Sequence, residues 1–223
     1  LREHISARIN GKGRVVVGLS GGCVQQEMVE ELEMIDRDLR AGGQRHPPSL
    51  AAEASAGSVT FCSLNKMAWP DGRARRSAEF LAVRLSDLYE NTAVVSVPVT
   101  DDFVLNMKAF RDAVSETDII FLSGGARSGS FVVQFLAQRR EKVDASAVGD
   151  INGHLVDATG AEVGCKAVRD LIQRNLRCYP SLSELRSMAR GKNRKIVLLL
   201  NAFSYGAEDP GRPELGHASK LEL

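Results

Sequence analysis

Two stretches of this chain share one pattern, an apolar and mostly β-branched run that ends in Ser-Gly-Gly. The first covers residues 14–22 (Arg-Val-Val-Val-Gly-Leu-Ser-Gly-Gly) and the second covers residues 118–125 (Asp-Ile-Ile-Phe-Leu-Ser-Gly-Gly). Short runs without alternating polar residues are typical of strands buried on both faces of a sheet. After the first run, apolar side chains recur at helical spacing from Val24 to Leu39. This predicts a unit of strand, glycine turn and helix.

The same alternation continues along the chain. The remaining pattern predicts strands at residues 58–64, 92–98 and 194–200, and helices at residues 74–89, 103–114, 128–139 and from Ser181, whose capping-box partner is Glu184. Between residues 149 and 164 the period changes to two, which predicts a β-hairpin that turns at residues 158–160. We therefore expect an α/β fold with a mostly parallel, Rossmann-like sheet covered by helices on both faces, and a small β-hairpin insertion.

The length of the chain allows one core, and we expect residues 1–223 to form a single domain. Residues 1–12 are predicted to form a lead-in helix. Residues 41–57 are rich in Ala, Gly, Ser and Pro, which predicts a surface loop, and residues 201–223 are expected to form an irregular tail.

Charge and composition argue against several functions. The chain has 29 Lys and Arg against 28 Asp and Glu, so its formal net charge of +1 creates no strong field toward nucleic acid or an acidic membrane. Aromatic residues make up only 5%, too few for platforms on which single-stranded nucleic acid would stack. The four cysteines include no CxxC pair, so we expect neither a metal site nor disulfides. No apolar run is long enough to cross a bilayer, and we expect a cytoplasmic protein.

The two Ser-Gly-Gly segments suit an anionic ligand. Backbone N–H groups in a glycine turn approach phosphate closely, and a following helix N-terminus adds partial positive charge. Neither segment is a Walker A loop or a GxGxxG fingerprint, and glycines that only permit a sharp turn are an equally good interpretation. Arg127 and Lys195 could add positive charge to the same cleft, or could be solvated surface residues.

A more specific signal lies in residues 147–160, Ala-Val-Gly-Asp-Ile-Asn-Gly-His-Leu-Val-Asp-Ala-Thr-Gly. This run resembles the GDI-x-G-x-x-x-D-x-x-G hairpin in the effector-binding domain of SorC-type sugar-responsive transcription regulators. The two Ser-Gly-Gly segments resemble that family's glycine loops, and residues 191–197 resemble its closing, lysine-led strand. The similarity covers roughly Val15 to Leu200.

The resemblance implies a fold similar to glucosamine-6-phosphate deaminase and ribose-5-phosphate isomerase, used to sense a phosphorylated sugar without transforming it. It implies a homodimer or homotetramer, no cofactor, no metal, and DNA contact only through an N-terminal helix-turn-helix domain that is not part of these residues. The ligand-binding positions that it implies are Gly18, Ser20, Gly21, Gly22, Asn65, Gly124, Gly125, Arg127, Asp150 and Lys195.

Two departures from the family pattern keep other functions open. Cys23 and Val24 stand where the family's first loop offers a threonine, and the chain diverges after Leu200. An isomerase or deaminase would need a general base, for which Asp150, His154 and the pair at residues 101–102 (Asp-Asp) are candidates. A purely structural oligomerisation module would bind no ligand.

Overall fold

A computed structural model describes residues 2–41, 57–66, 73–97, 103–191, 194–201 and 220–222. Most of the predicted loop at residues 41–57, the aspartates at 101–102 and most of the predicted tail lie outside these residues. The parallel part of the sheet has the order β3-β2-β1-β4-β7. Its strands are β1 (Arg14–Leu19), β2 (Ser58–Ser63), β3 (Thr92–Val95), β4 (Ile119–Ala126) and β7 (Lys195–Asn201).

Three described strands run antiparallel to their neighbours. The hairpin of β5 (Gly149–Ile151) and β6 (His154–Val156) pairs with the last residues of β4, and β8 (Lys220–Glu222) pairs with β7. The sheet is therefore mixed and only partly parallel, which corrects the expectation of a mostly parallel sheet. Only the first half of β4 pairs with β1, at residues 119–121. On that side, residues 124–126 of β4 pair with β5 of the hairpin instead.

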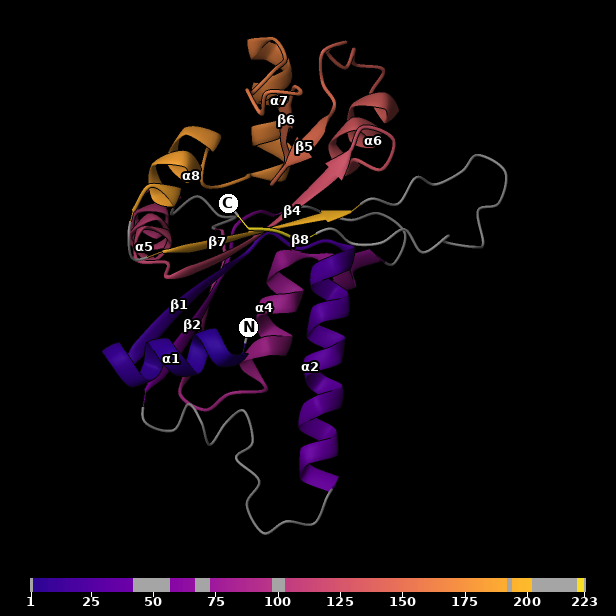
Figure 1. Cartoon of the computed structure of the whole chain (residues 1–223). Helices are drawn as coiled ribbons and strands as arrows, with labels where there is room; N and C mark the ends of the chain where they lie inside the picture. The colour runs from indigo at the N-terminus through magenta and orange to yellow at the C-terminus, as the bar shows by residue number, and fades with distance from the viewer. Residues whose placement is uncertain are drawn as a thin grey trace.

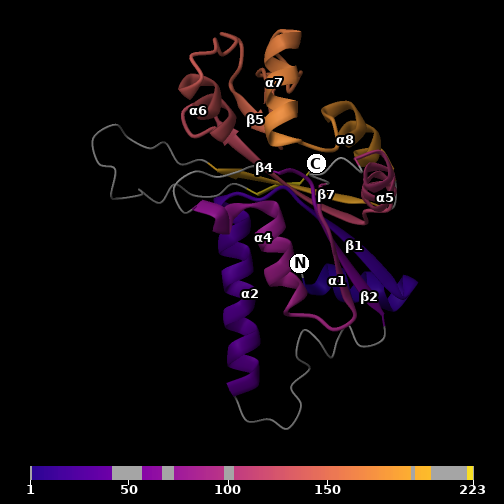
Figure 2. The ribbon, with the colours of Figure 1, turned by 180° about the vertical axis from the view of Figure 1, so that it is seen from behind.

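Helices cover both faces of this sheet (Figures 1 and 2). The helices of the described residues are α1 (Arg2–Lys12), α2 (Cys23–Ala41), α4 (Ala78–Ser86), α5 (Phe103–Ser115), α6 (Phe131–Gln138), α7 (Lys166–Leu176) and α8 (Leu182–Ala189), with a short 3₁₀ helix η1 (Arg73–Arg76). Figure 1 shows α1, α2 and α4 on one side of the sheet and α5 and α8 on the other, while α6 and α7 flank the hairpin.

The alternation of side chains along the strands creates two cores. Val15, Val17 and Leu19 of β1 pack with α1, α2 and α4, whereas Val16 belongs to the core with α5 and α8. Both sets are buried because successive side chains of a strand point to opposite faces. A third cluster lies around the hairpin and contains Leu155 with residues of α6 and α7.

The hairpin region contains one turn that the pattern did not predict. Asn152 and Gly153 form its two-residue loop, with φ angles of 48° and 83°. A type I′ turn needs positive φ at both central residues, and Asn-Gly is its strongest sequence signal. The predicted turn at residues 158–160 is also present, since Asp157 N donates to Ala161 O at 3.0 Å and Val156 bridges to Glu162 in the antiparallel sense. Helix α7 was missed, although Val168, Ile172 and Leu176 have helical spacing and are buried.

Other predicted elements agree with the structure apart from their bounds. The capping box of Ser181 and Glu184 is confirmed at the start of α8. The predicted helix at residues 74–89 is shorter, because residues 73–76 form η1 and Ser77 caps α4 by accepting a hydrogen bond from Phe80 N. Residues 220–222 of the predicted irregular tail form β8.

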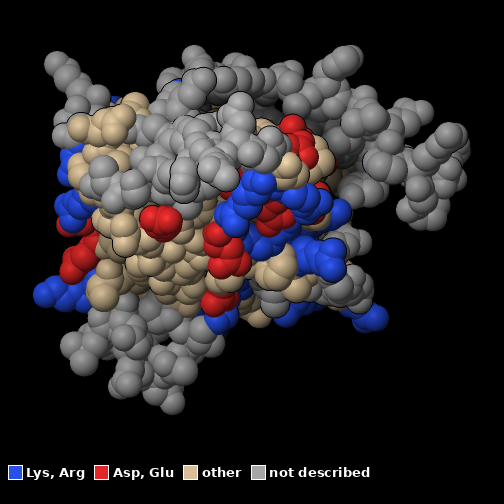
Figure 3. Space-filling model, turned by 90° about the horizontal axis from the view of Figure 1, so that it is seen from below, with Lys and Arg blue, Asp and Glu red and all other residues tan. Residues whose placement is uncertain are grey.

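Opposite charges connect the helices of the lower layer. Arg84 of α4 forms an ion pair with Glu33 and lies 3.7 Å from Glu30, both on α2. Figure 3 shows basic and acidic side chains interspersed on the face seen from below. In the described part of the chain, no helix is long and apolar enough to cross a membrane.

One buried carboxylate joins α1, β1 and β4. Asp118 accepts hydrogen bonds from Lys12 Nζ at 2.7 Å and from Val16 N at 3.2 Å, while its own N–H donates to Val16 O. The Asp118 carboxylate thus extends the ladder between β1 and β4 by one acceptor. Its side chain is 8% exposed, in contrast to the Arg14–Glu116 pair beside it, where both side chains are more than half exposed.

This contrast predicts two different mutational effects. Asp118→Ala should lower the free energy of unfolding by roughly 2–3 kcal/mol, because it leaves Val16 N–H without an acceptor in the sheet. Glu116→Ala should cost less than about 1 kcal/mol, because its ion pair is exposed. Urea unfolding of both variants measures the difference, and equal losses would contradict the assigned role of Asp118.

Candidate functional site

The carboxyl ends of β1 and β4 meet where the chain order of the sheet reverses, since β1 connects to β2 on one side and pairs with β4 on the other. Ligands of open α/β sheets bind at such a point. Ser123 N donates to Ser20 Oγ at 2.6 Å, and Ser123 Oγ donates to Gly21 O. The two Ser-Gly-Gly segments therefore lie side by side at this point.

Close approach of these segments requires a glycine at position 22. Gly22 has a φ of 106°, which L-residues with side chains rarely adopt. A Cβ atom there would lie 2.8 Å from Ser123 Oγ. Any side chain at this position would thus separate the β1–α2 turn from β4.

The side chain of Gln25, in the first turn of α2, connects the two segments. Its Nε2 donates to Ser20 Oγ at 3.1 Å, to Phe121 O at 3.1 Å and to Ser123 Oγ at 3.0 Å, and its Oε1 accepts from Gly21 N at 3.0 Å. Gln25 has no exposed surface. Both ends of one buried carboxamide therefore hold the β1–α2 turn against β4.

The amides of the two segments are already hydrogen-bonded within the protein. Ser20 N donates to Phe121 O at 3.1 Å and Gly22 N donates to Arg76 O at 2.8 Å, in addition to the bond of Gly21 N with Gln25. The second segment is not a turn, which corrects the expectation of a glycine loop there. Gly124 and Gly125 lie inside β4, paired with both β5 and β7.

A cavity of about 60 Å³ lies over this junction. One water needs roughly 10–15 Å³ on the same measure, so the cavity holds several water-sized groups. Its walls come from the β1–α2 turn, η1, the end of β4, the start of α6, the hairpin and β7. The lining residues are Ser20, Gly21, Gly22, Cys23, Val24, Arg76, Ser123, Gly124, Gly125, Gly129, Phe131, Gln134, Asp150, Asn152, Gly153 and Leu199.

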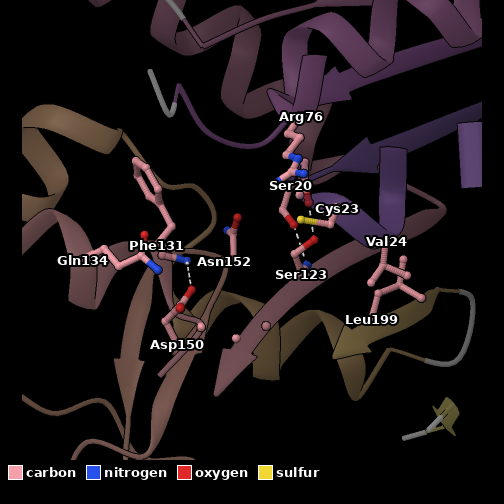
Figure 4. A pocket seen from close by; sticks show the side chains of 16 residues that line it. Ser20, Cys23, Val24, Arg76, Ser123, Phe131, Gln134, Asp150, Asn152 and Leu199 are labelled. Carbon is pink, nitrogen blue, oxygen red and sulfur yellow. Dashed lines mark hydrogen bonds between the residues drawn. The ribbon is translucent and has the colours of Figure 1, made fainter. Parts of the chain in front are cut away.

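The cavity has two different sides, as Figure 4 shows. Arg76 lies near Ser20 and Ser123 on one side. The side chains of Phe131, Gln134 and Asp150 lie on the other, with Asn152 between them. The polar groups comprise a guanidinium, a carboxylate, two carboxamides and two hydroxyls, a set that offers both donors and acceptors.

Burial raises the pKa of Asp150 from 3.8 to about 6, although hydrogen bonds from Ser130 and Gly153 N and the nearby charge of His154 act in the opposite direction. Gly125 makes room for this carboxyl, because a Cβ there would lie 3.3 Å from Asp150 Oδ1 and 3.1 Å from Ser130 Cα. A strongly perturbed carboxyl in a cavity is a common mark of a functional site.

Asn65 and Asn152 form a second buried link behind the cavity. Asn65 Nδ2 donates to Ser20 O at 2.5 Å and to Asn152 Oδ1 at 3.2 Å, and Asn152 Nδ2 donates to Tyr179 O at 3.0 Å. The hairpin turn is also held to β4 by the bond from Asn152 N to Ser123 O at 2.9 Å. These bonds fix the position of the hairpin, and with it Asp150, relative to the β1–α2 turn.

The structure brings together six of the ten predicted ligand-binding residues. Those that line the cavity are Ser20, Gly21, Gly22, Gly124, Gly125 and Asp150. Asn65 supports the wall from behind. Gly18 lies within β1, where a Cβ would contact Leu64 Cδ1 at 3.1 Å, so this position is set by packing.

The two predicted basic residues lie elsewhere. Arg127 Nη1 donates to the carbonyl oxygens of Asp144, Ala145 and Ala147, and so closes a loop away from the cavity. Lys195 begins β7 opposite Ile119, at the amino end of the parallel strands, whereas the cavity is at their carboxyl ends. The amino ends and the carboxyl ends of parallel strands lie at opposite edges of the sheet. The expectation that Lys195 lies in this cleft is therefore corrected.

Sequence reasoning missed Arg76, Phe131, Gln134 and Asn152 as lining residues. Only Asn152 had a usable signal, because the Asn-Gly pair that begins two residues after Asp150 marks a turn. His154 does not line the cavity. Its ring nitrogens face Glu162 Oε1 and Pro180 O, each at 3.2 Å. Among the described residues, no cluster of His, Cys, Asp and Glu could hold a metal ion.

No family model and no curated protein matches the chain. Several solved structures share its fold at low sequence identity. A DeoR family transcriptional regulator from Listeria monocytogenes is 14% identical, with a TM-score of 0.52 over 91% of this chain and 74% of that chain. A domain assigned as sugar-binding in a transcriptional repressor from Vibrio fischeri is 12% identical, with a TM-score of 0.53 over 88% and 72%.

The full-length sorbitol operon regulator SorC from Klebsiella pneumoniae is 14% identical, with a TM-score of 0.50 over 88% of this chain and 60% of that chain. The resemblance to SorC-type regulators, which the hairpin motif indicated, is therefore confirmed at the level of the fold.

The hydrogen bonds of Gln25 predict a large effect of its removal. Gln25→Ala should lower the free energy of unfolding by roughly 2–4 kcal/mol. The substitution removes the hydrogen-bond partner of Gly21 N–H and one partner of each of two serine hydroxyls in a buried site. Gln138→Ala, at an exposed position at the end of α6, should change it by less than about 0.5 kcal/mol. Urea denaturation measures the free energy of unfolding of both variants. A Gln25→Ala variant as stable as the parent would contradict the connecting role of Gln25.

The raised pKa of Asp150 predicts a pH dependence of stability. Between the unfolded pKa of 3.8 and the folded pKa of about 6, the folded state binds more protons, so stability falls as pH rises through this window. Asp150→Asn should therefore be more stable than the parent at pH 7–8, by on the order of 2 kcal/mol, and nearly equal at pH 4.

Asp157→Asn is the control of opposite sign. Hydrogen bonds, of which the one from the Thr159 side chain has the largest effect, lower the pKa of Asp157. The contribution of Asp157 to stability is therefore present above about pH 4 and is lost as pH falls. That variant should be less stable than the parent at neutral pH. Melting temperatures from pH 4 to 8 measure both, and a less stable Asp150→Asn at pH 8 would contradict the first assignment.

Proposed function

We propose that this chain is the effector-sensing domain of a transcription regulator and that the cavity between β1, β4 and the hairpin binds a carbohydrate. The observation that carries the proposal is the cavity itself, at the point where the chain order of the sheet reverses and with a dense set of polar side chains. Two carboxamides and one carboxyl on rigid elements suit the many hydroxyl donors and acceptors of a sugar. Phe131 adds an apolar wall for the C–H face of a sugar ring.

The shared fold supports the regulatory part of the proposal. The three structures compared above come from transcription regulators, one with a domain assigned as sugar-binding. Fold alone does not assign a function, so the proposal rests on the cavity and uses the fold as support. DNA would then be contacted by a separate domain of the same protein, and assembly into homodimers or homotetramers would couple the two.

We further propose that the sugar is phosphorylated. The first turn of α2 begins at Cys23, in the cavity wall, and a helix N-terminus favours an anion. The guanidinium of Arg76 lies beside it.

The isomerase or deaminase alternative has no positioned acid–base pair among the described lining residues. Asp150 lines the cavity alone as a carboxyl, and His154 bonds elsewhere. A sensor would bind its ligand without consuming it.

A thermal-shift screen tests the proposal. The panel contains pentoses, hexoses and hexitols, each free and as the monophosphate. A true ligand at 100 times its Kd should stabilise the chain by about 2.7 kcal/mol, which raises the melting temperature by roughly 5–10 °C. The compound should be recovered unchanged by NMR after incubation.

The matched variants are Asp150→Ala and Asp38→Ala. Asp38 lies exposed on α2, so its removal should leave the shift intact, while removal of Asp150 should abolish it. Turnover of the stabilising compound would assign an enzyme instead. A shift that survives Asp150→Ala would move the ligand to another place on the molecule.

A further inference from the structure

Arg76 is a lining residue that no sequence motif indicated. It ends η1, and its main chain is fixed, because its carbonyl accepts a hydrogen bond from Gly22 N at 2.8 Å. The same carbonyl would lie 2.5 Å from a Cβ at Gly21. The base of the Arg76 side chain is therefore held against the β1–α2 turn by backbone contacts that do not involve the guanidinium.

The guanidinium is aimed by one hydrogen bond. Arg76 Nε donates to Gln26 Oε1 at 3.3 Å, and Gln26 Nε2 donates to Glu30 Oε1 at 2.7 Å. Within the described part of the chain, Arg76 has no ion pair, and its two Nη groups have no hydrogen-bond partner. A partly buried guanidinium in this state gains from an anion that matches its fork of N–H donors.

Arg76 is also the one Lys or Arg among the described residues that line the cavity. The amides that could have replaced it are engaged, since Gly21 N and Gly22 N donate to Gln25 Oε1 and to Arg76 O. Arg127 and Lys195, the basic candidates from the sequence, lie elsewhere. Positive charge in this cavity therefore comes from Arg76 and the start of α2.

The opposite side carries the carboxyl of Asp150, and Figure 4 shows Arg76 and Asp150 on opposite sides with Asn152 between them. Such a polarised cavity orients a ligand that has an anion at one end and hydroxyl groups at the other. A phosphate beside Asp150 would meet a carboxylate, whereas hydroxyl groups there would donate to it.

We propose that Arg76 is the specificity-determining residue of this cavity, which selects the phosphorylated form of a sugar over its neutral form and orients the phosphate toward the β1–α2 turn. This inference rests on the proposed carbohydrate-binding function and deepens it. It moves the anion-binding role from the glycine amides, as expected from the sequence, to a side chain of η1.

The test measures the affinity of matched pairs, each a free sugar and its monophosphate, by titration calorimetry. The variants are Arg76→Gln, Arg76→Lys and the control Arg75→Gln, which removes an exposed arginine one residue earlier. Inorganic phosphate alone is a further probe. The fixed main chain of Arg76 does not depend on its side chain, and urea midpoints verify that each variant is folded.

The parent chain should bind the monophosphate more tightly than the free sugar, and more weakly as salt rises, because ionic contacts are screened. Arg76→Gln should reduce the preference for the monophosphate roughly 10- to 100-fold, the effect of a lost charge-assisted bond, with little change for the free sugar. Arg76→Lys should keep part of the preference. Arg75→Gln should keep the full preference for the monophosphate. Inorganic phosphate should compete with the monophosphate for binding to the parent chain and to Arg75→Gln, but not for binding to Arg76→Gln.

Three results would overturn the inference, and they differ from one another. If no sugar of either form binds the parent chain, the proposed function fails and the inference with it. If the free sugar binds as tightly as its monophosphate, the carbohydrate site stands and the role of Arg76 fails. If Arg76→Gln weakens both forms equally, Arg76 shapes the cavity without selecting the anion.

Discussion

The structure depends on the buried carboxamide of Gln25. It is the point at which the β1–α2 turn, the start of α2 and the end of β4 are connected, through both its donor and its acceptor ends. A buried amide of this kind is stabilising only when every partner is in place. The same contact consumes the Gly21 amide that a phosphate would otherwise use. The turn is therefore held in place, and a ligand in the cavity would meet the side chains around it.

Those side chains come from elements that the sheet brings together at the end of β4. Only half of β4 pairs with β1, so the hairpin joins the remaining half and places Asp150 over the junction. Burial of that carboxyl opposes the charged form, so Asp150 lowers the stability of the folded state at neutral pH. Opposite it, η1 places Arg76 beside the β1–α2 turn. A polarised cavity results from two segments that are 74 positions apart in the sequence.

Much of the fold followed from local pattern. Buried strands at β1 and β4, the helix after β1 and the capping box of α8 were all readable, because apolar periodicity and cap chemistry are local properties. The errors have local causes too. The Asn152–Gly153 turn and α7 were not predicted, although the Asn-Gly pair and the spacing of α7's buried residues are local signals. The Ser-Gly-Gly of residues 123–125 has the composition of a turn, but composition does not reveal that two neighbouring strands pair with these residues.

The sequence by itself determined the α/β class, the residues that end β1, and the hairpin that carries Asp150. It did so because strand burial, glycine conformation and turn chemistry act between near neighbours in the chain. Only the tertiary structure decided which donors remain for a ligand. Whether Gly21 N–H meets Gln25, whether Arg127 closes a loop, and whether Arg76 faces the cavity depend on contacts between distant segments. Which hydrogen-bond partners a group has depends on the three-dimensional packing of distant segments, and those partners decide which polar groups of this site remain available.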